Sequence, residues 1–387
     1  MRIGILTFFA SINYGAFLQA YSLQQVLLER YAGSAIVEMI CYDSDRSHNI
    51  YSHWKAKEAA DKYASFVSDW KYLNLTEKML ISDSIEEISR FISEQNYDIV
   101  ISGSDEVFKT DGMRGFPNAY WLNYDIGKAK RVAYAVSGRN NYSLHEEAEK
   151  EYIKSALERF YFLGTRDEIT RQELGKFTEK KIYMNCDPCF LMADFWAGKD
   201  SVFRKYKQTD KQISNKNFSE KKIVLVMTTD YKISKLFREQ YSFEFMVVGN
   251  MVRNKSYTDE YIYDFDPFRW ADYFSKIDFM ITDFFHGTVF SIINNVPFIS
   301  IERGTKGRGK IENLLIEHGI EDRLLYLEDY SDSLEKLTVT VRGMMDGIMD
   351  VPKSLYEGIV KKEQAKAGSF FEAIDNLNLK VRRGDSL

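Results

Sequence analysis

One histidine breaks an apolar run in the second half of the chain. The run reads ITDFFHGTVF, residues 281–290, and His286 is one of only five histidines in 387 residues. A strand is expected over 276–282 and a helix from His286, which would stand just past a strand end, in a first helical turn. Gly287 lets the backbone come close to a ligand, and the N–H groups of such a turn favour an anion. His286 could act as a general acid or base, or it could simply cap the helix or bond a backbone carbonyl.

A carboxylate follows two small residues at the end of another apolar run. In VISGSDEVF, residues 100–108, Gly103 and Ser104 precede Asp105. At a strand end this group could hold a sugar hydroxyl or orient a catalytic base. Ser104 or Asp105 could equally cap a helix that starts there.

A tight turn is expected after the first apolar run. Asn13 and Gly15 in NYGAFLQAYSLQQ, residues 13–25, suit a turn between a strand and a helix. The spacing is not GxGxxG, so a dinucleotide-binding fingerprint is absent from this segment. These residues either line a ligand site at the helix start or only form the turn and cap the helix.

An arginine is predicted where the dipole of a helix disfavours positive charge. Arg166 in FLGTRDEITRQEL, residues 162–174, directly follows an expected strand, and Asp167 and Glu168 occupy the first turn of the next helix. Arg166 should therefore have an anionic partner, either Asp167 or a ligand. A planar guanidinium is the natural clamp for a carboxylate or a phosphate.

A glycine-rich basic loop, ERGTKGRGK, follows a further predicted strand. Its cations are Arg303, Lys306, Arg308 and Lys310. The loop is either a solvated, flexible connection or a clamp that closes over an anion.

The three cysteines indicate neither a disulfide framework nor a metal site. Cys41, Cys186 and Cys189 are an odd number spread over a long chain, as in proteins of a reducing compartment. Cys186 and Cys189 form the CxxC motif CDPC. Zinc would need further ligands at suitable spacing, and redox use would need a helix start, which the pattern does not show. We interpret both as structural cysteines beside a turn.

The composition is that of a globular protein with a mildly acidic charge. Hydrophobic residues make up 45% of the chain and aromatic residues 15%; the formal net charge is −5 and the pI is near 5.8. This balance argues against a nucleic-acid partner. No secretory signal is clear, and no segment approaches the roughly 20 apolar residues of a membrane span. We therefore expect a cytoplasmic protein, with at most peripheral association at the inner face of the membrane.

The elements that position these residues follow from the alternation of apolar runs with amphipathic segments, which is typical of parallel sheets covered by helices. Strands are expected within residues 2–9, 35–43, 97–105, 130–138, 160–168 and 181–188, and again within 222–230, 243–250, 261–266, 276–283 and 296–302. The predicted fold class is α/β, with two Rossmann-like domains facing a central cleft. Ligands of such sheets bind beyond the carboxyl ends of the strands.

The predicted domain boundaries follow the same pattern. The first Rossmann-like domain covers 1–197, a polar, lysine-rich connector covers 198–222, the second Rossmann-like domain covers 223–335, and helices with a polar tail cover 336–387.

Taken together and in this order, the segments resemble the polysaccharide pyruvyl transferase family. The resemblance spans roughly residues 1–325 and rests on NYGAFLQAYSLQ, DIVISGSDEVF, GTRDEITRQEL, CDPCFLM and DFFHGTVFSIINNVPFISI followed by KIENLLIEHGI. It implies a fold like that of B-type glycosyltransferases, with the acceptor side in the first domain and the donor side in the second. It also implies transfer of a pyruvyl group from phosphoenolpyruvate to sugar hydroxyls of a surface polysaccharide or its lipid-linked precursor, leaving a pyruvate ketal and phosphate.

The resemblance also implies roles for individual residues. His286 is expected to transfer a proton or steady the departing phosphate, and Asp105 to deprotonate or orient the acceptor hydroxyl. The expected donor-binding residues are Arg166, Gly287, Thr288, Arg308 and Lys310, and the expected acceptor or cleft residues are Asn13, Gly15, Gln19, Gly103 and Ser104. Phosphoenolpyruvate is expected as a substrate and a lipid-linked oligosaccharide as its acceptor, with no cofactor and no metal.

One position departs from the family pattern. Many members carry an arginine two residues before the histidine, where this chain has Phe284. The charge of the donor must then be met elsewhere, and Arg166, Arg308 and Lys310 are the candidates. Two alternatives stay open: a nucleotide-sugar-dependent glycosyltransferase on the same fold, and a non-catalytic carbohydrate-binding partner in polysaccharide assembly.

Overall fold

The chain forms two compact units, each built on its own sheet. The computed structural model describes residues 1–52, 57–138, 141–199, 221–303, 306–307, 309–330, 334–348 and 352–383. Unit 1 comprises Met1–Leu191 and Glu363–Leu387, and unit 2 comprises Met192–Lys362. Most of the predicted connector 198–222, and Arg308 of the basic loop, lie outside the described residues. The predicted C-terminal part 336–387 is divided between the two units.

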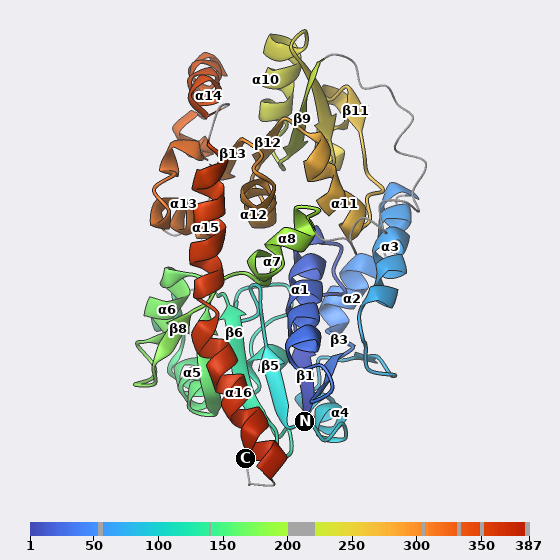
Figure 1. The fold of residues 1–387 in the computed structure, drawn as a ribbon, viewed down its shortest axis with the longest axis vertical. Coiled ribbons are helices and arrows are strands. Elements are labelled where there is room, and N and C mark those ends of the chain that lie inside the picture. Colours follow the sequence, from blue (N-terminus) through green and yellow to red (C-terminus); the bar gives the residue numbers. More distant parts are fainter. Residues whose placement is uncertain are drawn as a thin grey trace. The chain divides into compact units, whose positions relative to one another are not determined.

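Unit 1 contains a parallel six-stranded sheet with the order β2-β1-β5-β6-β7-β8 (Figure 1). Its strands are β1 (Arg2–Leu6), β2 (Ile36–Met39), β5 (Ile99–Ser102), β6 (Lys130–Val136), β7 (Phe160–Thr165) and β8 (Ile182–Met184). A separate parallel pair, β3 (Tyr42–Asp43) with β4 (Leu80–Ile81), was not predicted. Because β1 has β2 on one side and β5 on the other, the sheet has its topological switch point between β1 and β5.

The helices of unit 1 connect these strands, and one of them comes from the far end of the chain. They are α1 (Tyr14–Arg30), α2 (Asp45–Ser52), α3 (Lys57–Asp69), α4 (Ile85–Ser93), α5 (Glu147–Glu158), α6 (Glu168–Leu174), α7 (Pro188–Leu191) and α16 (Gly368–Arg383), with 3-10 turns η1 (Trp70–Tyr72), η2 (Ala119–Trp121) and η3 (Tyr142–Leu144). α16 packs beside β7, and the centroid of its Phe370 ring lies 4.3 Å from that of Tyr134 on the neighbouring strand β6.

Unit 2 contains a second parallel six-stranded sheet, with the order β11-β10-β9-β12-β13-β14. Its strands are β9 (Lys222–Met227), β10 (Phe245–Gly249), β11 (Glu260–Tyr261), β12 (Phe279–Thr282), β13 (Phe298–Glu302) and β14 (Leu324–Tyr326). β9 lies between β10 and β12, so the switch point of this sheet is between β9 and β12. β14 was not predicted.

The helices of unit 2 follow its strands in turn. They are α8 (Ala193–Trp196), α10 (Tyr231–Tyr241), α11 (Pro267–Tyr273), α12 (Phe285–Asn294), α13 (Lys310–Glu317), α14 (Leu334–Ile348) and α15 (Lys353–Ala365), whose last residues belong to unit 1, with 3-10 turns η4 (Val252–Tyr257), η5 (Phe274–Lys276), η6 (Glu321–Arg323) and η7 (Leu327–Tyr330).

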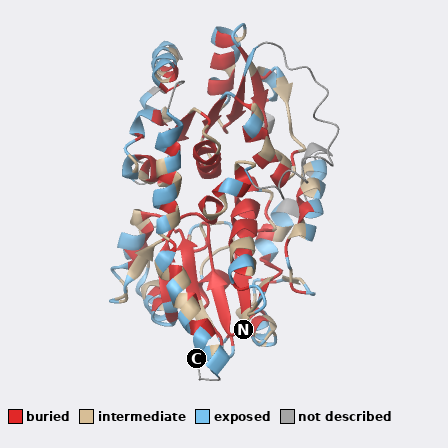
Figure 2. Ribbon diagram, viewed as in Figure 1, coloured by how far each residue is buried: buried red, intermediate tan, exposed pale blue. Residues whose placement is uncertain are grey.

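Burial explains why the sequence folds into these layers. All four residues of β5 and all five of β13 are buried, as expected for parallel strands covered on both faces (Figure 2). The predicted α/β class with two Rossmann-like sheets is confirmed. None of the described helices combines the length and the apolar character that crossing a bilayer requires.

Candidate functional site

In unit 1, a buried arginine at the end of β7 is held by two carboxyl groups. Nη1 of Arg166 donates to Oδ2 of Asp187 at 2.8 Å, and Nη2 donates to Oδ1 of Asp105 at 3.4 Å. The three side chains are 2%, 0% and 9% exposed, respectively. The backbone N–H of Arg166 also donates to the carbonyl of Val136, at 3.0 Å, which fixes the arginine to the neighbouring strand.

This arrangement determines the charge state of Arg166. Burial by itself lowers the pKa of a guanidinium, but the charges of Asp105 and Asp187 outweigh that effect, so the pKa of Arg166 is raised above its ordinary value. One guanidinium is thus matched by two carboxyl groups of the protein. The predicted partner Asp167 does not make this pair. It caps α6 instead, accepting from the N–H of Thr170 at 2.8 Å.

Asp105 has a strained backbone, as residues at functional sites often do. Its φ is +85°, in the left-handed region, and its Oδ1 accepts from the N–H of Glu106 at 2.8 Å. No helix begins there among the described residues, because η2 starts only at Ala119, so the helix-cap alternative for Ser104 and Asp105 is wrong. Gly103 has a φ of +120°, and a Cβ there would lie 2.1 Å from the carbonyl oxygen of Tyr134. Only glycine fits that position.

The predicted acceptor residues lie at the carboxyl edge of the unit 1 sheet, next to its switch point. Most of their hydrogen bonds connect secondary-structure elements to one another. Nε2 of Gln19 donates to Oγ1 of Thr7 at 3.0 Å, and Oγ1 of Thr7 donates to the carbonyl of Ser104 at 2.8 Å. These bonds connect α1 to the loops after β1 and β5. Asn13 caps α1 by accepting from the N–H of Ala16 at 3.3 Å, and Gly15 is buried in the first turn. The turn-and-cap alternative for Asn13 therefore describes its side chain.

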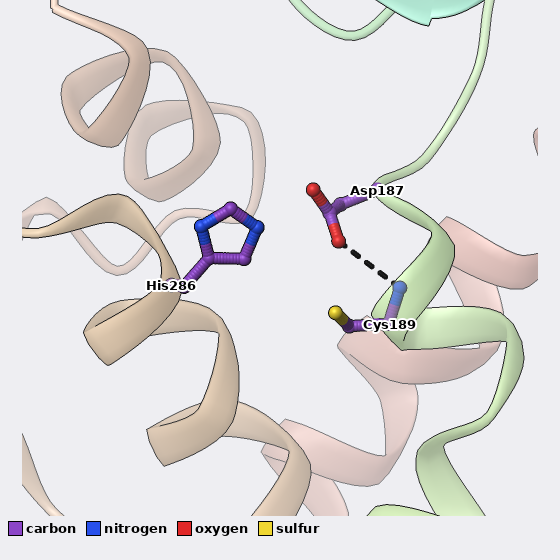
Figure 3. Close-up of side chains that lie close together, drawn as sticks. All are labelled: Asp187, Cys189 and His286. Carbon is purple, nitrogen blue, oxygen red and sulfur yellow. Dashed lines mark hydrogen bonds between the residues drawn. The ribbon is translucent and has the colours of Figure 1, made fainter. Parts of the chain in front are cut away.

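Asp187 of the CDPC motif supplies one of the two carboxyl groups that bond Arg166, and the sequence analysis gave it no role. Oδ1 of Asp187 accepts from the N–H of Cys189 at 3.0 Å, at the start of α7 (Figure 3). A helix therefore does begin within CDPC, contrary to expectation, although it is only four residues long. Burial is the main reason why the pKa values of both the Cys186 and Cys189 thiols are raised, so neither is a ready thiolate.

In unit 2, His286 is the second residue of α12 (Figure 3), as predicted. Phe284 is the N-cap residue and gives the first turn no side-chain hydrogen bond. The N–H of Phe284 donates to Oγ1 of Thr282 at 3.0 Å, which fixes the turn between β12 and α12. The side chain of His286 is thus presented at the carboxyl edge of the sheet, beside its switch point.

Gly287 and Thr288 hold α12 against the sheet. A Cβ on Gly287 would lie 2.5 Å from Oγ1 and 2.8 Å from Cβ of Thr282, so helix–strand packing requires glycine at this position. Oγ1 of the buried Thr288 hydrogen-bonds Oγ of Ser300 on β13, at 2.6 Å. Lys310 begins α13 and places Nζ 5.6 Å from the ring centroid of Phe285, the first residue of α12.

A second carboxylate–arginine pair lies at the edge of unit 2. Oδ2 of Asp283 accepts from Nε of Arg303 at 2.6 Å. It also accepts from the N–H and Oγ1 of Thr229, at 3.0 and 2.9 Å. Arg303 was noted in the sequence only as part of a basic loop, and Asp283 was given no role. The feature that could have identified both residues is their position, because each directly follows a strand of the same sheet.

Comparison with known proteins gives a family for the chain. The family model described as polysaccharide pyruvyl transferase matches residues 13–305. This range contains the described site residues of both units except Lys310. No curated protein sequence matches the chain.

Solved structures share the fold at low sequence identity. The UDP-GlcNAc 2-epimerase of Neisseria meningitidis, solved with UDP-GlcNAc bound, is 12% identical, with 97% of this chain and all of that chain covered and a TM-score of 0.54. The UDP-N-acetylglucosamine 2-epimerase of Rickettsia bellii is 7% identical, with 99% of this chain and 98% of that chain covered and a TM-score of 0.53. The UDP-GlcNAc 2-epimerase of Methanocaldococcus jannaschii is 13% identical, with 93% of this chain and 99% of that chain covered and a TM-score of 0.52. These structural similarities confirm the predicted glycosyltransferase-B-like architecture.

Proposed function

The chain belongs to the polysaccharide pyruvyl transferase family, and we propose that it transfers the pyruvyl group of phosphoenolpyruvate to sugar hydroxyls of a surface polysaccharide or its lipid-linked precursor. The observation that carries this proposal is the family match, because it runs through the site residues of both sheets. Family membership itself gives the coarser activity, transfer of a pyruvyl group to a polysaccharide. The donor, the ketal product and the lipid linkage are our proposal.

The reaction needs a proton donor, a base for a hydroxyl and a binding site for an anion. Two hydroxyls of the sugar form bonds to the enol carbon of phosphoenolpyruvate, and the bond from that carbon to the phosphate oxygen breaks. One hydroxyl proton is balanced by the proton that converts the methylene to a methyl group, and the other leaves with phosphate. General acid–base groups and fixed positive charge supply what this reaction requires.

The two units offer different parts of this chemistry. In unit 2, His286 lies in the first turn of α12, where it can protonate the methylene or steady the phosphate, and Lys310 supplies positive charge beside the same turn. In unit 1, Asp105 can orient or deprotonate the acceptor hydroxyl. Because Arg166 already faces two carboxyl groups, we assign it to positioning Asp105 rather than to clamping the donor.

The first experiment is a calorimetric titration of the full chain with phosphoenolpyruvate, with UDP-N-acetylglucosamine as the competing ligand. Saturable binding of phosphoenolpyruvate, and release of phosphate when a sugar acceptor is added, would support pyruvyl transfer. We expect His286→Ala and Asp105→Asn to lower kcat about 10²- to 10⁴-fold, the range for loss of a general acid or base. His318→Ala is the control, because this histidine ends α13 and has no assigned role. Binding of the sugar nucleotide alone would favour a glycosyltransferase, and binding of oligosaccharide without turnover would favour a non-catalytic partner.

Arg166→Lys separates the two roles of Arg166. A lysine keeps the charge but cannot bond two carboxyl groups through a planar fork. If Arg166 positions Asp105, kcat falls while the Kd for phosphoenolpyruvate stays within about threefold. A rise in that Kd with kcat preserved would instead restore the direct donor contact that the sequence suggested.

A further inference from the structure

We propose that Arg303 binds an acidic group of the donor in unit 2 and that Asp283 positions it for this purpose. The inference rests on the proposed function, since it takes the donor to be a small dianion or trianion such as phosphoenolpyruvate. Neither residue was among the predicted site residues. Both lie at the carboxyl edge of the unit 2 sheet, at or next to its switch point.

Asp283 is built into the fold as a fixed acceptor. Its side chain is only 3% exposed, and its Oδ2 receives hydrogen bonds from Thr228, Thr229 and Arg303. Thr228 and Thr229 directly follow β9, which is the first strand of this sheet along the chain and lies beside β12. Its other oxygen, Oδ1, is buried without a hydrogen-bond partner among the described residues. Such a carboxylate holds an arginine in one orientation.

The guanidinium group of Arg303 is bonded to the protein only through Nε in the described part of the chain. Its Nε bonds Oδ2 of Asp283 at 2.6 Å, while 40% of its side chain is exposed. In the described part of the chain, Asp283 is its one ion-pair or hydrogen-bond partner. The Nη1 and Nη2 groups thus remain for a planar anion, which a guanidinium can bind through two parallel hydrogen bonds. This is the reverse of Arg166 in unit 1, which is 2% exposed and bonded to two carboxyl groups.

The position of Arg303 is suited to the group that His286 would act on. Asp283, to which Arg303 is bonded, precedes the first residue of α12 by two positions, and His286 is the next residue of that turn. Lys310 lies over the ring of Phe285 in the same turn. Two cations from the two ends of the β13–α13 connection therefore flank one helix start, and the positive end of the helix dipole adds to their effect on an anion. A carboxylate and a phosphate on one small molecule match this arrangement.

The test is calorimetric titration of phosphoenolpyruvate into the full chain and its variants. We expect Arg303→Ala to weaken binding about 10- to 100-fold, the loss of one or two charge-assisted hydrogen bonds, with Arg303→Gln as a second variant that keeps bulk and polarity. Arg303→Lys should recover only part of the affinity, because an ammonium group keeps the charge but lacks the planar guanidinium that can bond Asp283 through Nε and the donor through Nη1 and Nη2. Arg238→Ala is the matched control: it removes an arginine of unit 2 that is 47% exposed and pairs with Asp259 beside the start of β11.

A double-variant cycle tests the positioning role of Asp283. Asp283→Asn keeps an acceptor for Thr229 but loses the ion pair, and we expect a roughly fivefold weaker Kd for phosphoenolpyruvate. If Asp283 acts through Arg303, the same substitution in the Arg303→Ala background changes the Kd no further. A purely structural role would give the same added loss in both backgrounds and would overturn this part of the proposal.

The outcomes separate this inference from the proposed function. Binding by the wild-type chain that Arg303→Ala and Arg303→Gln leave unchanged would overturn the role of Arg303 and leave pyruvyl transfer intact. Failure of the wild-type chain to bind phosphoenolpyruvate would overturn both. Selective loss in the Arg303 variants, with the Arg238→Ala control unaffected, would support both.

Discussion

At the scale of single residues, the environment of a charged group decides what it can do. Arg166 and Arg303 both follow a strand and both bond an aspartate, yet the first is buried between two carboxyl groups and the second is half open to solvent. Removing one partner of a buried ion pair leaves an uncompensated charge in a poorly solvated place. The two arginines should therefore differ in how much folding stability depends on them.

We expect Arg166→Met to lower the free energy of unfolding by about 3–5 kcal/mol, because Asp105 and Asp187 would lose their counter-ion. The measurement is urea denaturation monitored by tryptophan fluorescence. Arg171→Met is the control, since Arg171 pairs with Glu168 on the exposed face of the same unit, with side chains 43% and 39% exposed. The control should cost less than about 1 kcal/mol. Equal losses in the two variants would contradict the buried triad.

The cysteines provide a pH-dependent prediction. Burial raises the pKa of Cys41 to about 11 and those of Cys186 and Cys189 further, so at pH 8 only about 0.1% of Cys41 is thiolate. Ellman's reagent should therefore label the native chain very slowly and all three thiols quickly in urea. Because an unfolded thiol loses its proton near pH ~8.5 while folded Cys41 keeps its own, stability should fall as pH rises from about 9 to 11. Rapid labelling of one native thiol would show that it is a reactive site.

The sequence could locate the charged residues but not their partners. His286 and Arg166 were placed correctly after strands because apolar runs and turn residues give strand ends directly. The Arg166–Asp187 bond joins residues 21 positions apart on different elements, and only the packed sheet brings them together. Asp187 was hidden in a motif interpreted through its cysteines, and Asp283 in a run interpreted through its histidine.

At the scale of elements, the packing of α12 against its sheet determines the position of His286. Residues Phe285–Ile293 of this helix are all buried, and its first turn rests on Thr282 with no room for a side chain at position 287. A small change there must move the helix start. The close approach of α12 to β12 is therefore a requirement of the site as well as of the fold.

Gly287→Ala should lower the free energy of unfolding by about 1–3 kcal/mol, as expected for overpacking, and should reduce kcat through displacement of the first turn. The readouts are urea denaturation and phosphate release. Gly343→Ala in α14 is the matched control. A Cβ there meets nothing within 4 Å, so alanine should be neutral or stabilise by up to about 1 kcal/mol. If both variants behave alike, Thr282 does not restrict α12.

Element prediction succeeded where burial was continuous and failed where elements were short. Ten of the eleven expected strand segments contain a strand, because buried parallel strands give uninterrupted apolar runs, and the segment 261–266 overlaps β11 only at Tyr261. The two-residue pair of β3 and β4 and the start of α7 within CDPC give no such run. Their geometry depends on tertiary contacts such as the Asp187 bond to the backbone of Cys189.

At the scale of the whole molecule, unit 1 is completed by the last helix of the chain. α16 places Phe370 against Tyr134 and Phe162, and its Asp375 accepts from Arg30 and Tyr31 of unit 1. The chain thus leaves unit 1 after Leu191 and returns to it at Glu363. Sequence periodicity predicted a helical end but not the unit to which it returns.

Truncation after residue 367 should destabilise unit 1 by roughly 5 kcal/mol or more, because burial of three large side chains, Phe370, Ile374 and Leu377, is lost. Urea denaturation of the truncated chain measures this. Asp375→Asn is the control that removes only the half-exposed ion pair with Arg30, and it should cost less than about 1 kcal/mol. An unchanged midpoint in the truncated chain would show that α16 is dispensable.

The return of the chain to unit 1 has a consequence during synthesis. Residues 1–191 emerge from the ribosome first, but α16 follows only after all of residues 192–362 have been made, which takes roughly 10–30 s at typical elongation rates. Over that interval the nascent sheet displays Tyr134 and Phe162 without the ring of Phe370 that covers them. This face of the first sheet is where we expect a ribosome-associated chaperone to bind the growing chain.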